Sequence, residues 1–112
     1  MAQSPLRIIL VSQKGGVGKS TIAANLAAWF TFKRAKKTCL LDFDPHGSSS
    51  TWVRDARPIG LQARHHPLDE SGARRWLLAA RTALRHATDG NEVIVADLTW
   101  TPQVDPEFLM GF

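Results

Sequence analysis

Between residues 13 and 20 the chain reads Gln13-Lys14-Gly15-Gly16-Val17-Gly18-Lys19-Ser20. An apolar run, Ile8-Ile9-Leu10-Val11, precedes this stretch, and an amphipathic segment from Thr21 to Phe32 follows it. This order predicts a strand, a glycine-rich loop and a helix, the arrangement in which backbone N–H groups and a helix N-terminus cradle the phosphates of a nucleotide. An ordinary turn would rarely combine three glycines, two lysines and a hydroxyl at this spacing.

The residue types of this loop match the chemistry of phosphate binding. Gly15, Gly16 and Gly18 let the backbone approach phosphate closely and take positive φ angles. Lys19 is expected to contact the β- and γ-phosphates, and the Ser20 hydroxyl is expected to bind Mg²⁺. The strict pattern begins with glycine, whereas this chain has Gln13 there.

The second lysine of the loop, Lys14, resembles the signature lysine of the deviant Walker A box in the ParA/MinD family of ATPases, which belong to the SIMIBI class of P-loop proteins. A second box, Leu40 to Ser48, is similar to the family's apolar strand ending in Asp-x-Asp-Pro-Gln-Gly, with His46 in place of the usual Gln. The run Val93 to Asp97 is similar to the Walker B strand. The order and spacing of the boxes, with Trp52 after the second, resemble the partition-type ParA branch most closely.

This resemblance implies ATP and Mg²⁺ as ligands and assigns roles to particular residues. The nucleotide-binding residues that it implies are Lys14, Gly15, Gly16, Val17, Gly18, Lys19, Ser20 and Thr21. The implied metal-site residues are Ser20, Asp42 and Asp97, and the implied catalytic residues are Lys14 and Asp44. Asp44 would position the attacking water, and Asp42 would support the metal. From the residues alone, Asp42 or Asp44 could instead cap the turn that follows the strand.

The resemblance also implies how such a protein works. Two subunits would form a sandwich dimer around two ATP molecules, and Lys14 of one subunit would reach the phosphates of the other. The leading hypothesis is a ParA-like ATPase for plasmid or chromosome partition or for cargo positioning, with non-specific DNA and a ParB-like stimulating protein as partners. The alternatives are a MinD-like positioning ATPase and a non-catalytic nucleotide-binding remnant or regulatory module. The segment Leu98 to Pro102 departs from the family pattern after Walker B.

Composition and length are those of a single domain, residues 1–112, in a chain with a net charge of +4. We expect a cytoplasmic protein that can associate with the nucleoid and has no membrane attachment, since neither a membrane span nor a secretory signal is recognisable. The basic balance suits nucleic-acid phosphates, although a solvated helix face explains it equally well. Cys39 lies in an apolar run and is expected to be a buried, inert thiol. The histidines show no zinc-ligand spacing.

Apolar runs alternate with helical patterns, which predicts an α/β fold with a parallel sheet flanked by helices. Strands are predicted at Arg7–Val11, Thr38–Phe43, Ile59–His65 and Val93–Ala96, and helices at Ser20–Lys33, Thr51–Ala56 and Asp69–Ala87. Pro45–Ser50 is predicted to be a loop. Members of the family are usually much longer, so we expect an N-terminal portion of a P-loop fold, truncated after the Walker B strand, with an exposed apolar sheet edge.

Overall fold

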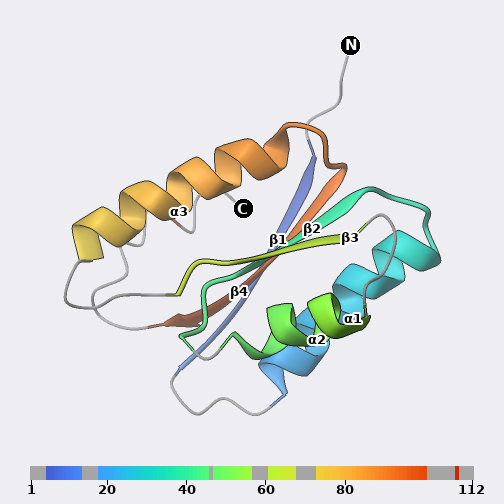
Figure 1. Ribbon diagram of the computed structural model, residues 1–112, viewed down its shortest axis with the longest axis horizontal. Helices are drawn as coiled ribbons and strands as arrows, with labels where there is room; N and C mark the ends of the chain where they lie inside the picture. Colours follow the sequence, from blue (N-terminus) through green and yellow to red (C-terminus); the bar gives the residue numbers. More distant parts are fainter. Residues whose placement is uncertain are drawn as a thin grey trace.

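The computed structural model describes residues 5–13, 18–45, 47–56, 61–67, 73–100 and 108. Strands and helices alternate along the chain (Figure 1). The strands are β1 (Leu6–Gln13), β2 (Thr38–Asp42), β3 (Leu61–His65) and β4 (Val93–Trp100), and the helices are α1 (Lys19–Phe32), α2 (Ser48–Ala56) and α3 (Ala73–Thr88). All strand pairs are parallel, and the order across the sheet is β1-β4-β2-β3. The predicted parallel α/β fold is therefore confirmed.

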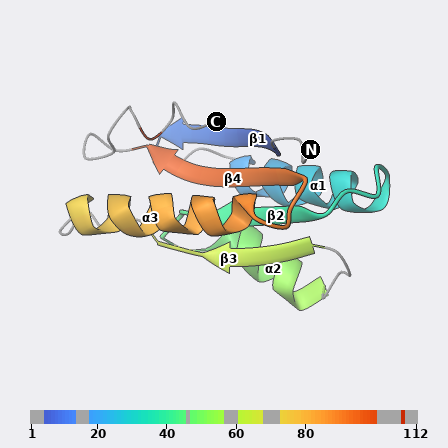
Figure 2. The same cartoon turned by 90° about the horizontal axis from the view of Figure 1, so that it is seen from above.

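Helices cover both faces of the sheet, with α1 and α2 on one face and α3 on the other (Figures 1 and 2). Successive side chains of a strand point to opposite faces, so each central strand supplies both cores. The core beneath α1 and α2 includes Leu40, Val93 and Val95, and the core beneath α3 includes Cys39, Leu41, Ile94, Ala96 and Leu98. This alternation explains why β2 and β4 read as continuous apolar runs.

Aromatic side chains anchor α3 on the sheet. The rings of Phe43, Trp76 and Phe108 lie pairwise 5.5 Å apart in edge-on arrangements. The Trp76 Nε1–H donates to the carbonyl of His66 at 3.2 Å, so the polar atom of this buried indole is satisfied. The spacing of Trp76, Leu77, Ala80 and Leu84 predicts an apolar stripe on this helix. All four side chains do pack in the core beneath α3.

The packing face of α1 differs from the prediction. By their helical spacing, Ile22, Leu26, Trp29 and Phe30 predict an apolar face for this helix. In the structure Ile22 and Trp29 are 57% and 47% exposed, and of the four only Leu26 and Phe30 pack against the core. The buried apolar positions of the helix are alanines, namely Ala23, Ala24 and Ala27. Alanines let the helix axis approach the sheet closely, which turns the larger side chains away from it.

The apolar run at Arg7–Val11 predicts a buried parallel strand, but this strand lies at the edge of the sheet. Among the described residues β1 pairs only with β4, and Leu6 and Val11 are 51% and 42% exposed. The apolar composition of β1 is what a central parallel strand normally has, so composition alone could not place it at an edge. The expectation of an exposed apolar edge holds for this part of the chain.

Two element boundaries within the described residues differ from the prediction by three residues or more. The segment Ser48–Ser50 was predicted to be loop, but it forms the first turn of α2, since the Thr51 N–H donates to the Gly47 carbonyl at 3.0 Å. The last strand was predicted to end before Asp97, but β4 continues to Trp100 because it pairs with β1 along its whole length. None of the helices described is long and apolar enough to cross a membrane.

Candidate functional site

The acidic residues of the site lie at the carboxyl ends of two adjacent strands. Asp42 ends β2, Asp97 lies towards the end of β4, and the two are partners in the parallel register. Both side chains are completely buried. In open α/β sheets, ligands bind outside the carboxyl ends of the strands, so these residues mark the edge at which a site is expected.

Lys19 reaches this acidic pair from the first turn of α1. Gly18 precedes it with φ +87°, a conformation that favours glycine and that turns the chain from the loop into the helix. The Lys19 ammonium contacts Asp97 Oδ1 directly and lies 3.8 Å from Asp44 Oδ2. Burial lowers the pKa of Lys19 below its ordinary value of 10.5, while the carboxylates of Asp44 and Asp42 act in the opposite direction.

Two hydroxyls complete the surroundings of Asp97. Ser20 Oγ, from the first turn of α1, donates to Asp97 Oδ2 at 3.0 Å. Ser49 Oγ, from the first turn of α2, donates to the same oxygen at 2.9 Å. Asp97 therefore joins α1, α2 and β4, and its charge is balanced by a lysine and two hydroxyl donors although no part of it reaches solvent.

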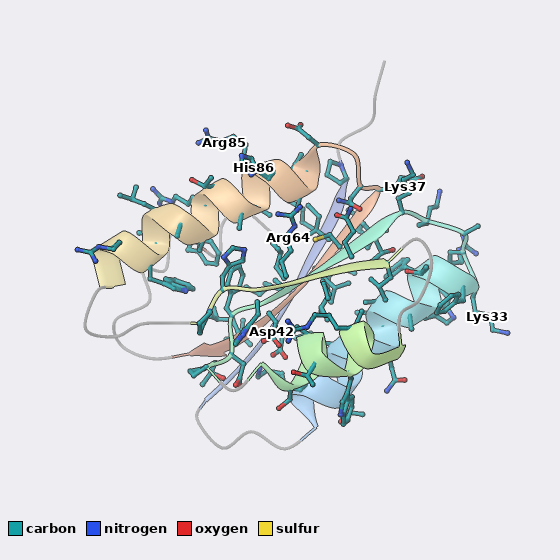
Figure 3. The ribbon with its side chains drawn as sticks, viewed as in Figure 1. Lys33, Lys37, Asp42, Arg64, Arg85 and His86 are labelled. Carbon is teal, nitrogen blue, oxygen red and sulfur yellow. The ribbon has the colours of Figure 1, made fainter. Side chains whose placement is uncertain are left out.

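Both carboxylate oxygens of Asp42 accept hydrogen bonds from backbone N–H groups. Its Oδ1 accepts from Asp44 N at 3.0 Å, and its Oδ2 accepts from Ser50 N at 2.9 Å. The second bond satisfies one of the N–H groups that a helix start leaves without an intrahelical partner. Asp42 therefore caps the turn after β2, as one reading of the sequence allowed. Figure 3 shows Asp42 far from Lys33 and Lys37, which belong to the other end of the molecule.

Asp44 faces the same site with a partly exposed carboxylate. Thr99 Oγ1 donates to Asp44 Oδ2 at 2.8 Å, and Lys19 Nζ lies near the same oxygen. The Asp44 side chain keeps 16% of its surface accessible, whereas Asp97 has none. Of the acidic residues described at this site, Asp44 is thus the one that solvent reaches most readily.

The structure brings together Lys19, Ser20, Asp42, Asp44 and Asp97, all of which were predicted to be site residues. Thr21 lies exposed on the first turn of α1. The remaining predicted residues, Lys14, Gly15, Gly16 and Val17, lie outside the described residues, as does His46.

Three residues of the site were not predicted: Ser49, Thr99 and His65. Thr99 follows Asp97 by two positions in a strand, so the alternation of side chains could have placed it on the same face. Ser49 was assigned to a loop, which hid its place at the start of a helix. His65 ends β3 and approaches the Asp44 carbonyl, a contact between distant segments for which no local signal exists.

The donors of the site fit a magnesium ion that is shared with nucleotide phosphates. Within the described ranges, no three histidine, cysteine or carboxylate side chains are grouped so that they could hold a metal unaided. Mg²⁺ usually binds through one or two carboxylates together with water and substrate phosphates. Ser20 and Asp97 supply adjoining hydroxyl and carboxylate oxygens of the required hard character.

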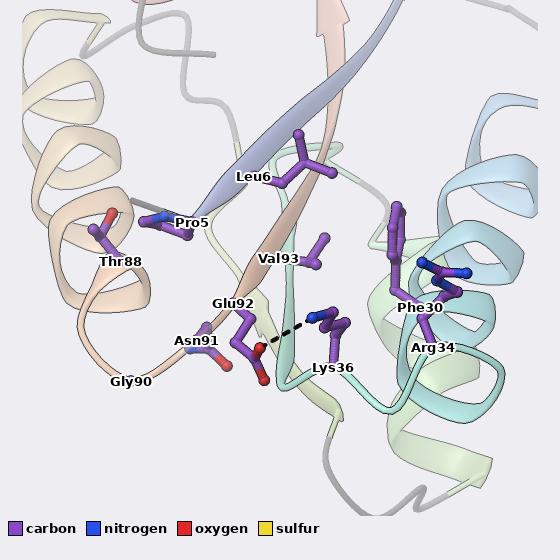
Figure 4. A pocket seen from close by; sticks show the side chains of 10 residues that line it. All are labelled: Pro5, Leu6, Phe30, Arg34, Lys36, Thr88, Gly90, Asn91, Glu92 and Val93. Carbon is purple, nitrogen blue, oxygen red and sulfur yellow. Dashed lines mark hydrogen bonds and ion pairs between the residues drawn. The ribbon is translucent and has the colours of Figure 1, made fainter. Parts of the chain in front are cut away.

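A cavity at the opposite end of the sheet does not share these features. It has a volume of about 660 Å³ and lies around the paired starts of β1 and β4 (Figure 4). Its described charged side chains include Lys36 and Glu92, which form an exposed ion pair at 3.5 Å. The described residues that were predicted to bind a nucleotide and its metal lie at the carboxyl ends of the strands instead, so the candidate site is at that edge.

A lysine and a hydroxyl at the start of α1, facing acidic residues at the ends of β2 and β4, define a P-loop nucleotide-binding domain. Residues 8–99 match the CobQ/CobB/MinD/ParA nucleotide binding domain, and the chain belongs to this family.

Similar proteins include the chromosome-partitioning ATPase Soj of Thermus thermophilus, which is 36% identical over 112 aligned residues that cover 81% of this chain and 45% of the relative. Soj of Treponema pallidum is 50% identical over 52 residues, which cover 46% of this chain and 20% of that protein. An iron-sulfur cluster carrier protein of Methanocaldococcus jannaschii is 47% identical over 71 residues, which cover 61% and 24% of the two chains. The chain thus spans about half the length, or less, of these relatives.

A solved structure supports the fold. The signal recognition particle 54 kDa protein of Aeropyrum pernix, in complex with GDP, superimposes with a TM-score of 0.53. The match covers 88% of this chain and 22% of that one, at 24% sequence identity. At this identity the likeness shows the fold, namely a parallel sheet flanked by helices as in P-loop proteins.

Proposed function

We propose that this domain binds ATP with Mg²⁺ and hydrolyses it as part of a ParA-like ATPase in the cytoplasm. One observation carries the proposal: Lys19 and Ser20, from the first turn of α1, converge on Asp97 and Asp44 at the ends of neighbouring strands. In phosphoryl transfer the protein mainly positions groups and stabilises charge, so this convergence supplies what the reaction requires.

Each residue of the site has a distinct role in this proposal. Lys19 leaves its contact with Asp97 and binds the β- and γ-phosphates. Asp97 and Ser20 hold the magnesium ion, which when bound neutralises charge on the phosphate oxygens. Asp44 orients the attacking water with its partly exposed carboxylate, and Thr99 fixes that carboxylate by donating to Oδ2. The contact with Asp97 balances the charge of Lys19 within the site.

The wider role rests on the relatives and on the resemblance of the first box. We propose an ATP-dependent sandwich dimer in which Lys14 reaches the partner's phosphates, with partition of DNA or positioning of cargo as the outcome. Two of the relatives are named chromosome-partitioning ATPases, which favours non-specific DNA and a ParB-like stimulating protein as partners. A positioning role as in MinD, and a nucleotide-binding module without turnover, are the alternatives.

ATP binding and turnover test the proposal. Lys19→Ala should lower turnover about a hundredfold or more, because it removes the cation that faces the phosphates. Lys33→Ala is the matched control, since Lys33 is an exposed lysine at the opposite end of the same helix and should leave both properties unchanged. Equal turnover in wild type and Lys19→Ala would refute the proposed reaction. ATP binding without turnover would support the non-catalytic alternative.

Light scattering with and without ATP tests the dimer in the same preparation. We expect ATP to double the mass, and Lys14→Ala to retain ATP binding while losing turnover. Loss of ATP binding in Lys14→Ala would contradict a role for Lys14 across the dimer.

A further inference from the structure

The last residue of β3 contacts the backbone of a residue that faces the nucleotide site. His65 Nε2 lies 2.7 Å from the carbonyl oxygen of Asp44. The two residues come from separate segments, but the sheet fixes their approach, because His65 is the register partner of Asp42. The next N–H, of His66, donates to the Asp42 carbonyl at 2.8 Å, which ties the end of β3 to the same turn.

The imidazole also packs against the turn that follows Asp44. The Gly47 N–H donates to the Asp44 carbonyl at 3.1 Å, so this oxygen accepts from Gly47 while it faces His65. A Cβ on Gly47 would lie only 2.7 Å from the His65 ring, which shows how closely the ring covers the backbone there. The imidazole therefore holds both ends of the turn that begins with Asp44.

The side chain of Asp44, whose backbone His65 contacts, points into the site. Asp44 Oδ2 accepts from Thr99 at 2.8 Å and lies 3.8 Å from Lys19 Nζ. A carboxylate in this position can act on a nucleotide only if its backbone is fixed, because small displacements at a reacting centre are costly. His65 is the described side chain that contacts this backbone from the β3 side.

We propose that His65 is a positioning residue for ATP hydrolysis, whose Nε2–H, donated to the Asp44 carbonyl, holds the Asp44 carboxylate in its reactive place. The inference rests on the proposed function. A carbonyl oxygen can only accept a hydrogen bond, so the proposal requires a proton on Nε2. In this proposal His65 acts only through Asp44.

Two substitutions separate the donor from the shape of the ring. His65→Phe keeps a ring over Gly47 but has no donor, and His65→Gln places an amide N–H at about the reach of Nε2. We expect His65→Phe to lower kcat about tenfold, as the loss of one hydrogen bond allows, with the KM for ATP unchanged. His65→Gln should restore most of the rate. Gln62→Ala, at an exposed position on the same strand, is the matched control.

The outcomes distinguish this inference from the proposed function. Wild-type kcat in His65→Phe, or a kcat in His65→Gln as low as in His65→Phe, would overturn the role of His65 while the ATPase proposal stands. Absence of turnover in the wild type would overturn the ATPase proposal and the positioning role with it. Nitrogen-15 NMR of labelled histidine, without nucleotide, gives a second readout: Nε2 of His65 should be protonated, and an unprotonated Nε2 would refute the contact.

Discussion

The buried contact between Lys19 and Asp97 predicts a strong energetic coupling that can be measured without nucleotide. Asp97 is fully buried and Lys19 is 9% exposed, so water solvates neither charge well. Each residue therefore balances the charge of the other. Removing one partner of a buried pair costs about 3–5 kcal/mol, because the other charge is left unbalanced. A domain of this size has a total stability of about 6–17 kcal/mol, so either single substitution should be strongly destabilising.

The structure also indicates which substitution costs more. In Lys19→Met, Asp97 keeps the hydroxyl donors Ser20 and Ser49, which places the cost at about 3 kcal/mol, the lower end of that range. In Asp97→Asn, Lys19 loses its direct contact and keeps the more distant carboxylates of Asp44, at 3.8 Å, and of Asp42. The double substitution leaves neither charge unbalanced, so it should cost less than the sum of the singles by about 2–3 kcal/mol.

Urea unfolding followed by tryptophan fluorescence measures all four proteins of this cycle. The exposed ion pair between Lys36 and Glu92 offers a matched control in the same chain. Its partners are solvated, so Lys36→Met and Glu92→Gln should show no resolvable coupling. Additive costs for Lys19→Met and Asp97→Asn, indistinguishable from the surface cycle, would refute the reasoning, since a buried contact between opposite charges cannot be energetically independent.

Two further predictions concern stability. Gly47→Ala should destabilise the fold by about 1–2 kcal/mol because of its φ of +66° alone, and by more because the new Cβ meets the His65 ring. The control is Gly90→Ala, where φ is +96° and no atom lies within 4 Å of the new Cβ. Equal losses of stability in the two variants would contradict the packing on His65. Burial raises the pKa of the Cys39 thiol from 9.0 to about 11, so the unfolded chain releases this proton first and stability falls between these pH values. The free energy of unfolding, measured with urea, should fall by about 2–3 kcal/mol at alkaline pH. This fall should be absent in Cys39→Ala, and an equal fall in that variant would exclude the thiol as its origin.

The sequence predicts that the main site residues lie close together, because each of them belongs to a local sequence pattern. Lys19 and Ser20 follow a glycine-rich loop, and Asp97 lies towards the end of an apolar run. Once parallel strands are inferred, their carboxyl ends must meet at one edge, and the helix after β1 must begin there. No side-chain contact had to be known to expect these residues together.

The contacts that refine the site could not be predicted in this way. The start of α2 at Ser48 depends on the Asp42 carboxylate, which accepts from the Ser50 N–H eight residues further along the chain. The face of α1 depends on how closely Ala23 and Ala27 let the helix approach the sheet. Both features arise from packing between elements, whereas hydrophobic periodicity describes each element alone.

The two acidic residues of the second box, Asp42 and Asp44, have different roles: Asp42 holds the backbone, and Asp44 faces the site. Both oxygens of Asp42 accept from backbone N–H groups, one at Asp44 and one at the start of α2. Asp42 therefore holds the turn through one accepted hydrogen bond on each of its carboxylate oxygens. The same turn presents the more accessible Asp44 carboxylate to Lys19 and Thr99. A loss of activity in an Asp42 variant should thus come with a loss of stability, whereas Asp44→Asn should lower turnover at nearly unchanged stability.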